Sequence, residues 1–174
     1  MVYCPHRGES PLPKQERSVL MNSPTQVLIS MNAVSRTDLN SREPDEPIRM
    51  LVPGRLTIEN GIYMLRYQET QQDENGDVVG VQNITLTMAP GRVTMTREGA
   101  FGTTMVFVRG QRFEGAYHTP YGDLEMAVYA TKVDCRLAPH AGTVNLQYTL
   151  DMQGAFAAMN TLELTYAVNT HKPS

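Results

Sequence analysis

The stretch from residue 60 to residue 97 reads NGIYMLRYQETQQDENGDVVGVQNITLTMAPGRVTMTR. Within it apolar residues alternate with polar ones, as in ITLTM at residues 84–88. Such alternation is typical of a β-strand that is buried on one face only. The dipeptides Asn60-Gly61 and Pro90-Gly91, and the run DENGD at residues 73–77, favour tight turns. The stretch therefore predicts successive antiparallel strands joined by short hairpins.

The same alternation continues on both sides and predicts nine or ten strands in all. These strands are expected at residues 25–33, 48–58, 62–70, 81–88, 92–97, 103–108, 113–119, 124–137, 144–152 and 162–168. An up-and-down meander of this length must cover its edge strands, and closure into a barrel does so most completely. We therefore predict an all-β fold, a single antiparallel closed barrel of about 8–10 strands. An open sandwich is the alternative.

Three places interrupt the simple pattern. Pro53-Gly54 removes a backbone donor and relaxes the chain within one strand, which predicts a bulge or a corner. The apolar phase of residues 124–137 shifts by one residue, which predicts a bulge or a break near Thr131. Asp151 to Thr161 is rich in Ala and Met, but Gly154 makes a loop or short turn a better interpretation than a helix.

Composition and charge narrow the class of protein. The chain has 174 residues, of which 41% are hydrophobic and 19% charged, as expected for one globular domain. A net charge of −3 leaves no basic surface for phosphates, which argues against a nucleic-acid binder. Cys4 and Cys135 are too few for a disulfide framework and are expected to be free thiols.

The domain prediction has three parts. Residues 1–24 carry four prolines and no period, so they are expected to form a flexible extension. Residues 25–168 form the barrel, and residues 169–174 form a short tail. No apolar run is long enough to span a bilayer or to act as a signal peptide, which predicts a cytoplasmic protein without a membrane partner.

Spaced residues along this whole region are similar to those of the YwiB-like proteins, a bacterial family of unknown function. The residues that carry the resemblance are Gly61-Ile62-Tyr63, Tyr67, Glu69, Gly91-Arg92-Val93, Arg97, Gly99, Met105, Phe107, Gly110, Tyr117, Thr119, Tyr121-Gly122, Leu124, Met126, Tyr148 and Leu150. Their order and spacing together, over residues 25–168, support the resemblance. It implies a lipocalin-like, calycin-type β-barrel and supplies no activity to transfer.

Several polar side chains fall in the apolar phase of their strands and could therefore line the barrel interior. These candidate ligand-binding residues are Tyr63, Tyr67, Glu69, Arg97, Arg109, Tyr117 and Thr119. A guanidinium in a low-dielectric lumen suits a carboxylate or phosphate, and tyrosines beside it shape an amphipathic pocket. In the alternative interpretation Glu69 pairs with Arg97 inside the barrel, and the tyrosine hydroxyls bond to strand-end carbonyls. Arg109, next to Gly110 at a strand end, could equally reach solvent.

Motifs for metal or covalent chemistry are missing from the sequence. His6, His118, His140 and His171 are dispersed, and Cys4-Pro5-His6 offers only two ligands, so no metal or cofactor is expected. No Gly-x-Ser-x-Gly motif occurs, and Cys135 lies in an apolar phase. The leading hypothesis is a barrel that binds a small amphipathic or acidic ligand. One alternative is a packed-shut structural or interaction module, which as a homodimer would pair an exposed strand. The other is an enzyme that uses Glu69 as a base.

Overall fold

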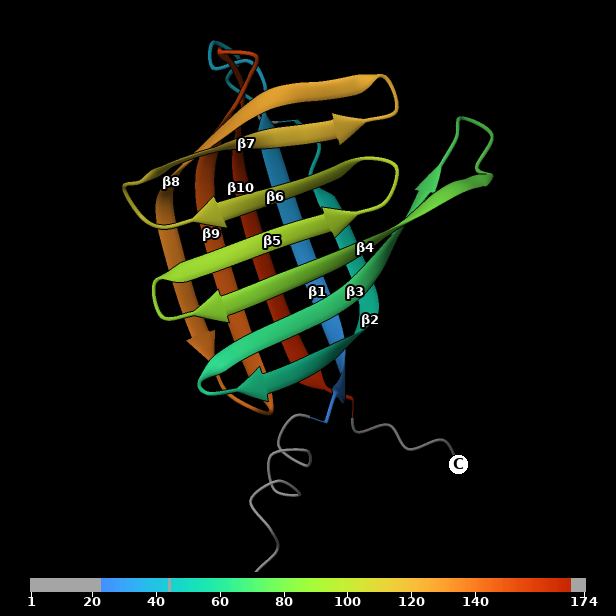
Figure 1. The fold of residues 1–174 in the computed structure, drawn as a ribbon, viewed down its shortest axis with the longest axis vertical. Coiled ribbons are helices and arrows are strands. Elements are labelled where there is room, and N and C mark those ends of the chain that lie inside the picture. Colours follow the sequence, from blue (N-terminus) through green and yellow to red (C-terminus); the bar gives the residue numbers. More distant parts are fainter. Residues whose placement is uncertain (1–22, 44, 170–174) are drawn as a thin grey trace, which may run out of the picture.

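The computed structural model describes residues 23–43 and 45–169, and this part of the chain folds into ten β-strands (Figure 1). The strands are β1 (Thr25–Arg36), β2 (Ile48–Glu59), β3 (Ile62–Gln72), β4 (Val78–Ala89), β5 (Arg92–Glu98), β6 (Gly102–Phe107), β7 (Arg112–Thr119), β8 (Gly122–Leu137), β9 (Ala141–Met152) and β10 (Ala155–Val168). Residues 1–22, with Cys4 and His6, and residues 170–174, with His171, lie outside the described residues, so the extension stays a prediction.

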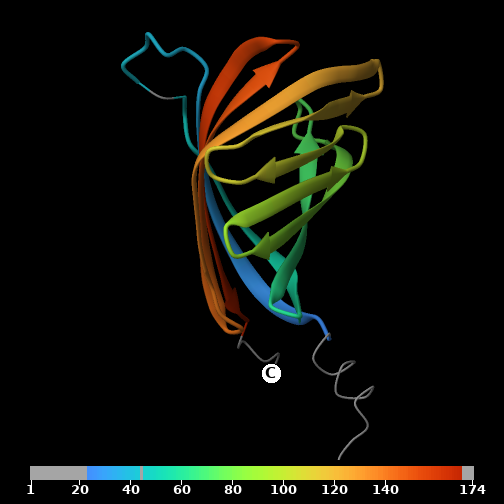
Figure 2. The same ribbon diagram turned by 60° about the vertical axis from the view of Figure 1, so that its left-hand side comes forward.

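The strands form one closed antiparallel barrel, which confirms the predicted fold class and rules out the open sandwich. Each strand pairs with the next along the chain, and β1 pairs with β10 to close the ring. Figure 2 shows that the long strands β1, β8, β9 and β10 form one wall, and the shorter β5 to β7 lie in the wall opposite. No helix in the described ranges is long and apolar enough to span a membrane.

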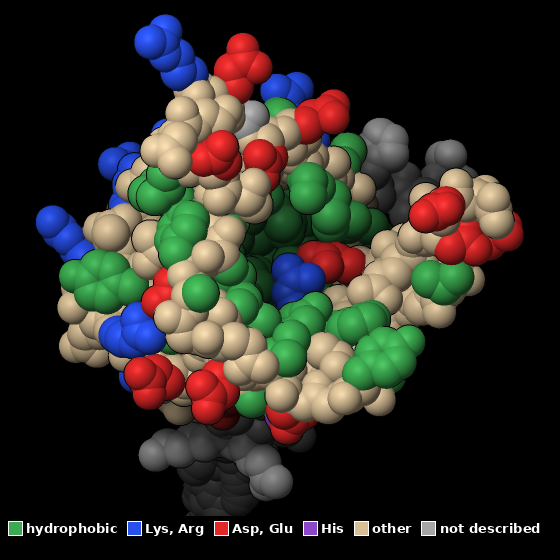
Figure 3. All heavy atoms as spheres, turned by 90° about the horizontal axis from the view of Figure 1, so that it is seen from above, with side chains coloured by type: hydrophobic (Ala, Val, Ile, Leu, Met, Phe, Trp, Pro, Cys, Tyr) green, Lys and Arg blue, Asp and Glu red, His purple; other side chains and the backbone are tan. Residues whose placement is uncertain are grey.

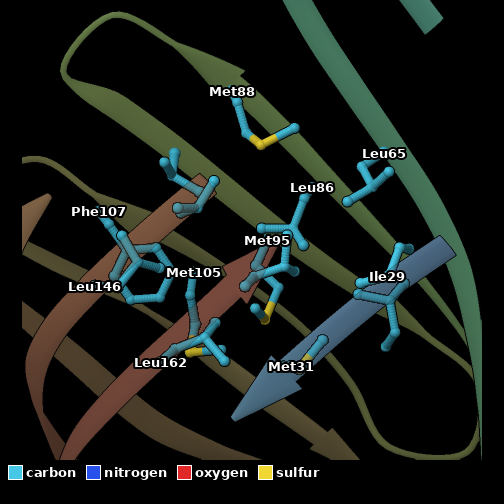
Figure 4. Packing of buried hydrophobic residues seen from close by; sticks show 14 of the residues in the cluster. Ile29, Met31, Leu65, Leu86, Met88, Met95, Met105, Phe107, Leu146 and Leu162 are labelled. Atoms are coloured by element: carbon cyan, nitrogen blue, oxygen red, sulfur yellow. The ribbon is translucent and has the colours of Figure 1, made fainter. Parts of the chain in front are cut away.

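The predicted alternation places the core inside the barrel. Figure 4 shows the side chains of Ile29, Leu86, Met95, Phe107 and Leu146 pointing inward from different strands. All five are buried in one continuous hydrophobic cluster. Burying a side chain of this size contributes about 1.5–3 kcal/mol relative to leaving it exposed, so the filled interior is the main source of stability.

The Pro53-Gly54 pair forms a corner without a bulge. The register between β1 and β2 is unbroken, with Val27 opposite Gly54 and Leu28 opposite Pro53. Pairing between β2 and β3, in contrast, begins only at Gly54, opposite Tyr67. Since Pro53 has no N–H to donate, the two strands separate there, and the upper part of β2 keeps β1 as its neighbour.

The bulge predicted near Thr131 is present. The pairing of β8 with β9 shifts register between Ala130 and Lys132, and the Thr131 hydroxyl donates to the carbonyl oxygen of Gln147 at 3.1 Å. The extra residue changes which phase of β8 faces inward. Met126 and Val128 face inward before the bulge, and Val133 and Cys135 face inward after it. Cys135 is a free, partly buried thiol.

Of the two interpretations for Asp151 to Thr161, the short turn is confirmed and the longer loop is wrong. The turn consists of Gln153 and Gly154 alone, with φ angles of 53° and 77°, and β10 begins directly afterwards at Ala155. The Ala-rich segment is held as a strand by its pairing with β9, which includes a register shift between Phe156 and Ala158. Tertiary pairing here overrides weak local propensity.

Candidate functional site

A belt of polar side chains lines the inside of the barrel near one end, which we call the open end. It is the upper end in Figure 1, where β1 ends and β2 begins. The polar belt consists of Glu69 on β3, Gln82 on β4, Arg97 on β5, Thr103 on β6 and Tyr117 on β7. The strand register places them in two neighbouring rows. Arg97, Thr103 and Tyr117 share one row with Tyr67 and Ile84, and Glu69 and Gln82 lie opposite each other in the next row toward the β3–β4 turn. Seen from above, this end is hollowed, with hydrophobic walls and a basic side chain beside an acidic one (Figure 3).

Arg97 and Glu69 form an ion pair in this hollow. Arg97 Nη1 donates a hydrogen bond to Glu69 Oε2 at 2.8 Å, and the two side chains are 30% and 18% exposed. The bond spans β4, which separates the strands that carry the two residues. This is the internal pairing that the sequence left as an alternative. The structure gives the guanidinium no second hydrogen bond to a described residue, so Nε and Nη2 remain available to a ligand.

Tyr67 brings a buried hydroxyl to the same place. Tyr67 is only 4% exposed, and its hydroxyl oxygen has no hydrogen-bond partner among the described residues. Burial raises the pKa of Tyr67 far above its usual value, and the Glu69 charge adds to that rise, while Arg97 opposes it. The phenol is therefore neutral and able to donate. A buried hydroxyl without a partner costs about 1–3 kcal/mol, so the position calls for a water or a ligand atom.

Tyr148 approaches the ion pair from the opposite wall. It lies on β9, its ring centroid is 4.7 Å from that of Phe107, and burial raises its pKa while Arg97 lowers it. Tyr148 also adds to the rise in the pKa of Tyr67. Two phenols, one on β3 and one on β9, thus lie within electrostatic range of Arg97.

The other side of the open end is apolar. Ala33 on β1, Met50 and Val52 on β2, and Leu150 and Met152 on β9 are partly buried and pack against the core. The hollow is consequently amphipathic, with the polar belt on β3 to β7 and an apolar surface on β1, β2 and β9. Deeper in the lumen, Met105 and Phe107 are buried in the core cluster, so the hollow is shallow.

The remaining belt residues are held by local contacts. Gln82 is buried, and its Nε2 donates to the carbonyl oxygen of Phe101 at 2.9 Å. The hydroxyl of buried Thr103 donates to the carbonyl oxygen of Ala116 at 3.0 Å. Tyr117 stacks on Phe101 with ring centroids 6.2 Å apart. The belt is therefore built from ordered side chains with defined positions.

Four of the seven candidate residues come together here, and three do not. Tyr63 lies toward the other end, opposite Ile58 and Met88. Arg109 is exposed beyond the end of β6, in an isolated bridge with Ala130, as its alternative interpretation allowed. Thr119 lies at the β7–β8 turn, where its hydroxyl donates to the carbonyl oxygen of Gly122 at 2.6 Å.

Sequence reasoning missed Gln82, Thr103 and Tyr148. Gln82 shares the phase of Ile84 and Leu86, and Thr103 shares that of Met105, so the signal used for Arg97 would have found both. Tyr148 shares the phase of Leu146 and Leu150, so the same signal applies to it. No group of residues that could hold a metal ion occurs in the described ranges.

Comparisons with known proteins place the chain in a family. Residues 31–164 match the family described as "Domain of unknown function (DUF1934)". The solved structure described as the ywiB protein from Bacillus subtilis superimposes with a TM-score of 0.71 at 19% identity, covering 91% of this chain and 100% of that chain. The curated proteins contain no match. The chain therefore belongs to the DUF1934 family, the YwiB-like group that the spaced residues indicated, whose function is unknown.

Proposed function

We propose that the barrel binds a small amphipathic ligand at its open end. The observation that carries the proposal is the hydroxyl of Tyr67, buried without a hydrogen-bond partner beside the Arg97–Glu69 pair. Natural proteins rarely leave a buried hydroxyl unsatisfied, and such groups concentrate at sites that receive another molecule. A ligand atom that accepts from Tyr67 supplies the missing partner.

The polar end of the ligand accepts hydrogen bonds. Arg97 offers Nε and Nη2, and Tyr67 offers its O–H, so three donors converge where Glu69 already occupies Nη1. A carboxylate satisfies this geometry, because a planar guanidinium binds it through two nitrogens. The negative charge of Glu69 weakens the attraction between Arg97 and an anionic ligand, so we expect the protein to bind such a ligand with modest affinity.

The body of the ligand is short and apolar. Ala33, Met50 and Val52 provide the surface on which it rests, and the buried Met105 and Phe107 block deeper entry. The ligand consequently lies across the open end, with its polar end toward β5 and its apolar end toward β2.

Binding is tested with octanoic acid as the probe and octanol as its neutral counterpart. Native mass spectrometry and amide chemical shifts are measured for the wild type, Tyr67→Phe, Arg97→Gln and the control Arg112→Gln. Arg112 lies in an exposed ion pair on the outside of the barrel, with Glu114 and Asp151, so it keeps the hollow intact. We expect the acid to bind more tightly than the alcohol, with shifts at the open end that disappear in Tyr67→Phe and Arg97→Gln but not in Arg112→Gln.

Two results overturn this proposal. One is the absence of shifts at the open end with either probe, which would leave water as the partner of Tyr67. The other is equal binding by all four proteins. Either result favours the packed-shut module, for which the buried Met105 and Phe107 are the supporting observation.

A further inference from the structure

On the outside of the barrel, strands β2, β1, β10, β9 and β8 carry side chains in straight rows that run across the strands. We call this surface the outer face. The register places Pro53, Leu28, Ala167 and Ala141 in one row across β2, β1, β10 and β9. The next row contains Leu51, Ser30, Thr165, Thr143 and, on β8, Arg136. Arg136 is the one charge among these nine positions. Charge-poor, flat sheet faces of this kind favour protein contact over hydration.

The outer face has a ridge beside a groove. Leu28 and Leu51 are 42% and 66% exposed and stand out from β1 and β2. Next to them the surface forms an open groove of about 790 Å³, floored by small residues of β9 and β10 that include Ala141, Gly142 and Ala167. A leucine ridge and a groove of small residues on one surface are complementary to each other.

We propose that a second copy of this chain covers the outer face, with a two-fold axis that runs between β1 and β10 and parallel to them. A two-fold axis of this kind makes the two contact surfaces identical, so the ridge of each copy enters the groove of the other. Leu28 of one copy then faces Ala167 of the other, and Leu51 faces Thr143. β1 and β2 of one copy lie over β10 and β9 of the other.

The next row along the strands contains charged residues, and the same two-fold axis brings opposite charges of the two copies together. Across β2, β1, β10, β9 and β8 this row contains Arg49, Asn32, Glu163, Asn145 and Asp134. The two-fold axis places Arg49 of one copy opposite Asn145 of the other, with Glu163 and Asp134 on either side of it. Arg49 therefore falls between two carboxylates, and symmetry makes this contact twice. In the described part of a single copy, none of these three charges forms an ion pair.

The size of the surface predicts a weak dimer. Five strands about 4.8 Å apart span about 20 Å, and three rows about 7 Å apart span about 14 Å along the strands. That footprint is smaller than the roughly 800 Å² per partner of a standard interface, so we expect a dissociation constant in the micromolar range. The contact concerns the outside of the barrel and is independent of ligand binding at its open end.

Sedimentation velocity and equilibrium of the full chain, from about 1 μM to about 500 μM, test the proposal over this affinity range. The wild type is expected to pass from monomer to dimer. Leu28→Glu, in which the acidic side chains of the two copies meet beside the two-fold axis in a row without a positive charge, is expected to stay monomeric, with a dissociation constant raised at least about tenfold. Val79→Glu is the control, because Val79 is also exposed but lies in the β3–β4 hairpin, away from the outer face. It is expected to dimerise like the wild type.

A charge exchange makes the test specific to the proposed arrangement. Arg49→Glu should weaken the dimer, and the combination of Arg49→Glu with Asp134→Lys and Glu163→Lys should restore it. All these positions are on the surface, and circular dichroism verifies that each variant is folded. A wild type that remains monomeric at the highest concentration overturns the proposal. So do equal effects of Leu28→Glu and Val79→Glu, or a triple variant without recovery.

Discussion

The ring of Tyr166 lies directly over Gly142 on the neighbouring strand. The two residues are paired between β10 and β9, and a Cβ atom on Gly142 would lie 2.5 Å from the ring. The Tyr166 hydroxyl cannot easily move aside, because it donates to the carbonyl oxygen of Ala138 at 2.7 Å. The aromatic ring thus covers a glycine and ties the β8–β9 connection to the closing strand.

This relationship predicts that Gly142→Ala destabilises the barrel. The added methyl group forces the ring away from its hydrogen bond, and overpacking of this kind costs about 1–3 kcal/mol. Urea denaturation followed by circular dichroism measures the loss. Gly80→Ala is the control, because a Cβ there meets only the side-chain oxygen of Gln71, at 3.3 Å. The two variants behaving alike would contradict the steric explanation.

The Arg97–Glu69 pair predicts unequal effects of single and double substitutions. Glu69→Gln leaves the partly buried Arg97 without an ionic partner and should lower the free energy of unfolding by about 1–2 kcal/mol, between the values for exposed and buried pairs. The double variant Glu69→Leu with Arg97→Met should recover most of this loss. Glu114→Gln, in an exposed pair with Arg112, should change stability by less than about 0.5 kcal/mol. The single variants Glu69→Leu and Arg97→Met complete the cycle, and if their effects add up to that of the double variant, the pair contributes no coupling energy.

Removing the hydroxyl of Tyr67 should not weaken the fold. Since this oxygen has no partner among the described residues, Tyr67→Phe deletes an unsatisfied group and should leave stability unchanged or raise it by about 1 kcal/mol. Thermal unfolding compares it with Tyr166→Phe, which loses the hydrogen bond to Ala138 and should lose about 0.5–1.5 kcal/mol. If Tyr67→Phe proves the more harmful of the two, an ordered water satisfies the phenol in the free protein.

Alkaline pH should destabilise the barrel through its buried tyrosines. Burial raises the pKa of Tyr166 to about 12, against about 10 for a free tyrosine, and the hydrogen bond to Ala138 only partly opposes the shift. Because the folded pKa lies above the unfolded one, the stabilising contribution is fully present below about pH 10. It is lost as the pH rises from about 10 toward about 12.

Denaturation midpoints at stepped pH, with tyrosinate absorbance, measure this dependence. Burial also raises the pKa of Tyr67 and Tyr148, so part of the decline should persist in Tyr166→Phe, with a smaller slope than in the wild type. Identical slopes in the two proteins would show that Tyr166 ionises as easily in the fold as in the unfolded chain.

Much of the candidate site was visible in the sequence because strand phase alone decides which side chains face inward. Arg97 shares a phase with Met95, and Glu69 shares one with Tyr67, so both were expected in the interior. The same rule was unreliable at strand ends. Arg109 and Thr119 have the appropriate phase, but Arg109 lies beyond its strand, and Thr119 is the last residue of β7, where its hydroxyl bonds to the carbonyl oxygen of Gly122 across the turn.

The sequence by itself determined a barrel of nine or ten strands, their inward faces, most of the turns and the bulge of β8, because these depend on a two-residue period and on local backbone chemistry. Tertiary structure alone decided which inward residues meet. Residues 28 positions apart form the Arg97–Glu69 bond, and Tyr67 and Tyr148 come near it from β3 and β9. Such meetings depend on register and barrel closure. The sequence pattern specifies neither at the level of single contacts, since each depends on the packing of the whole core.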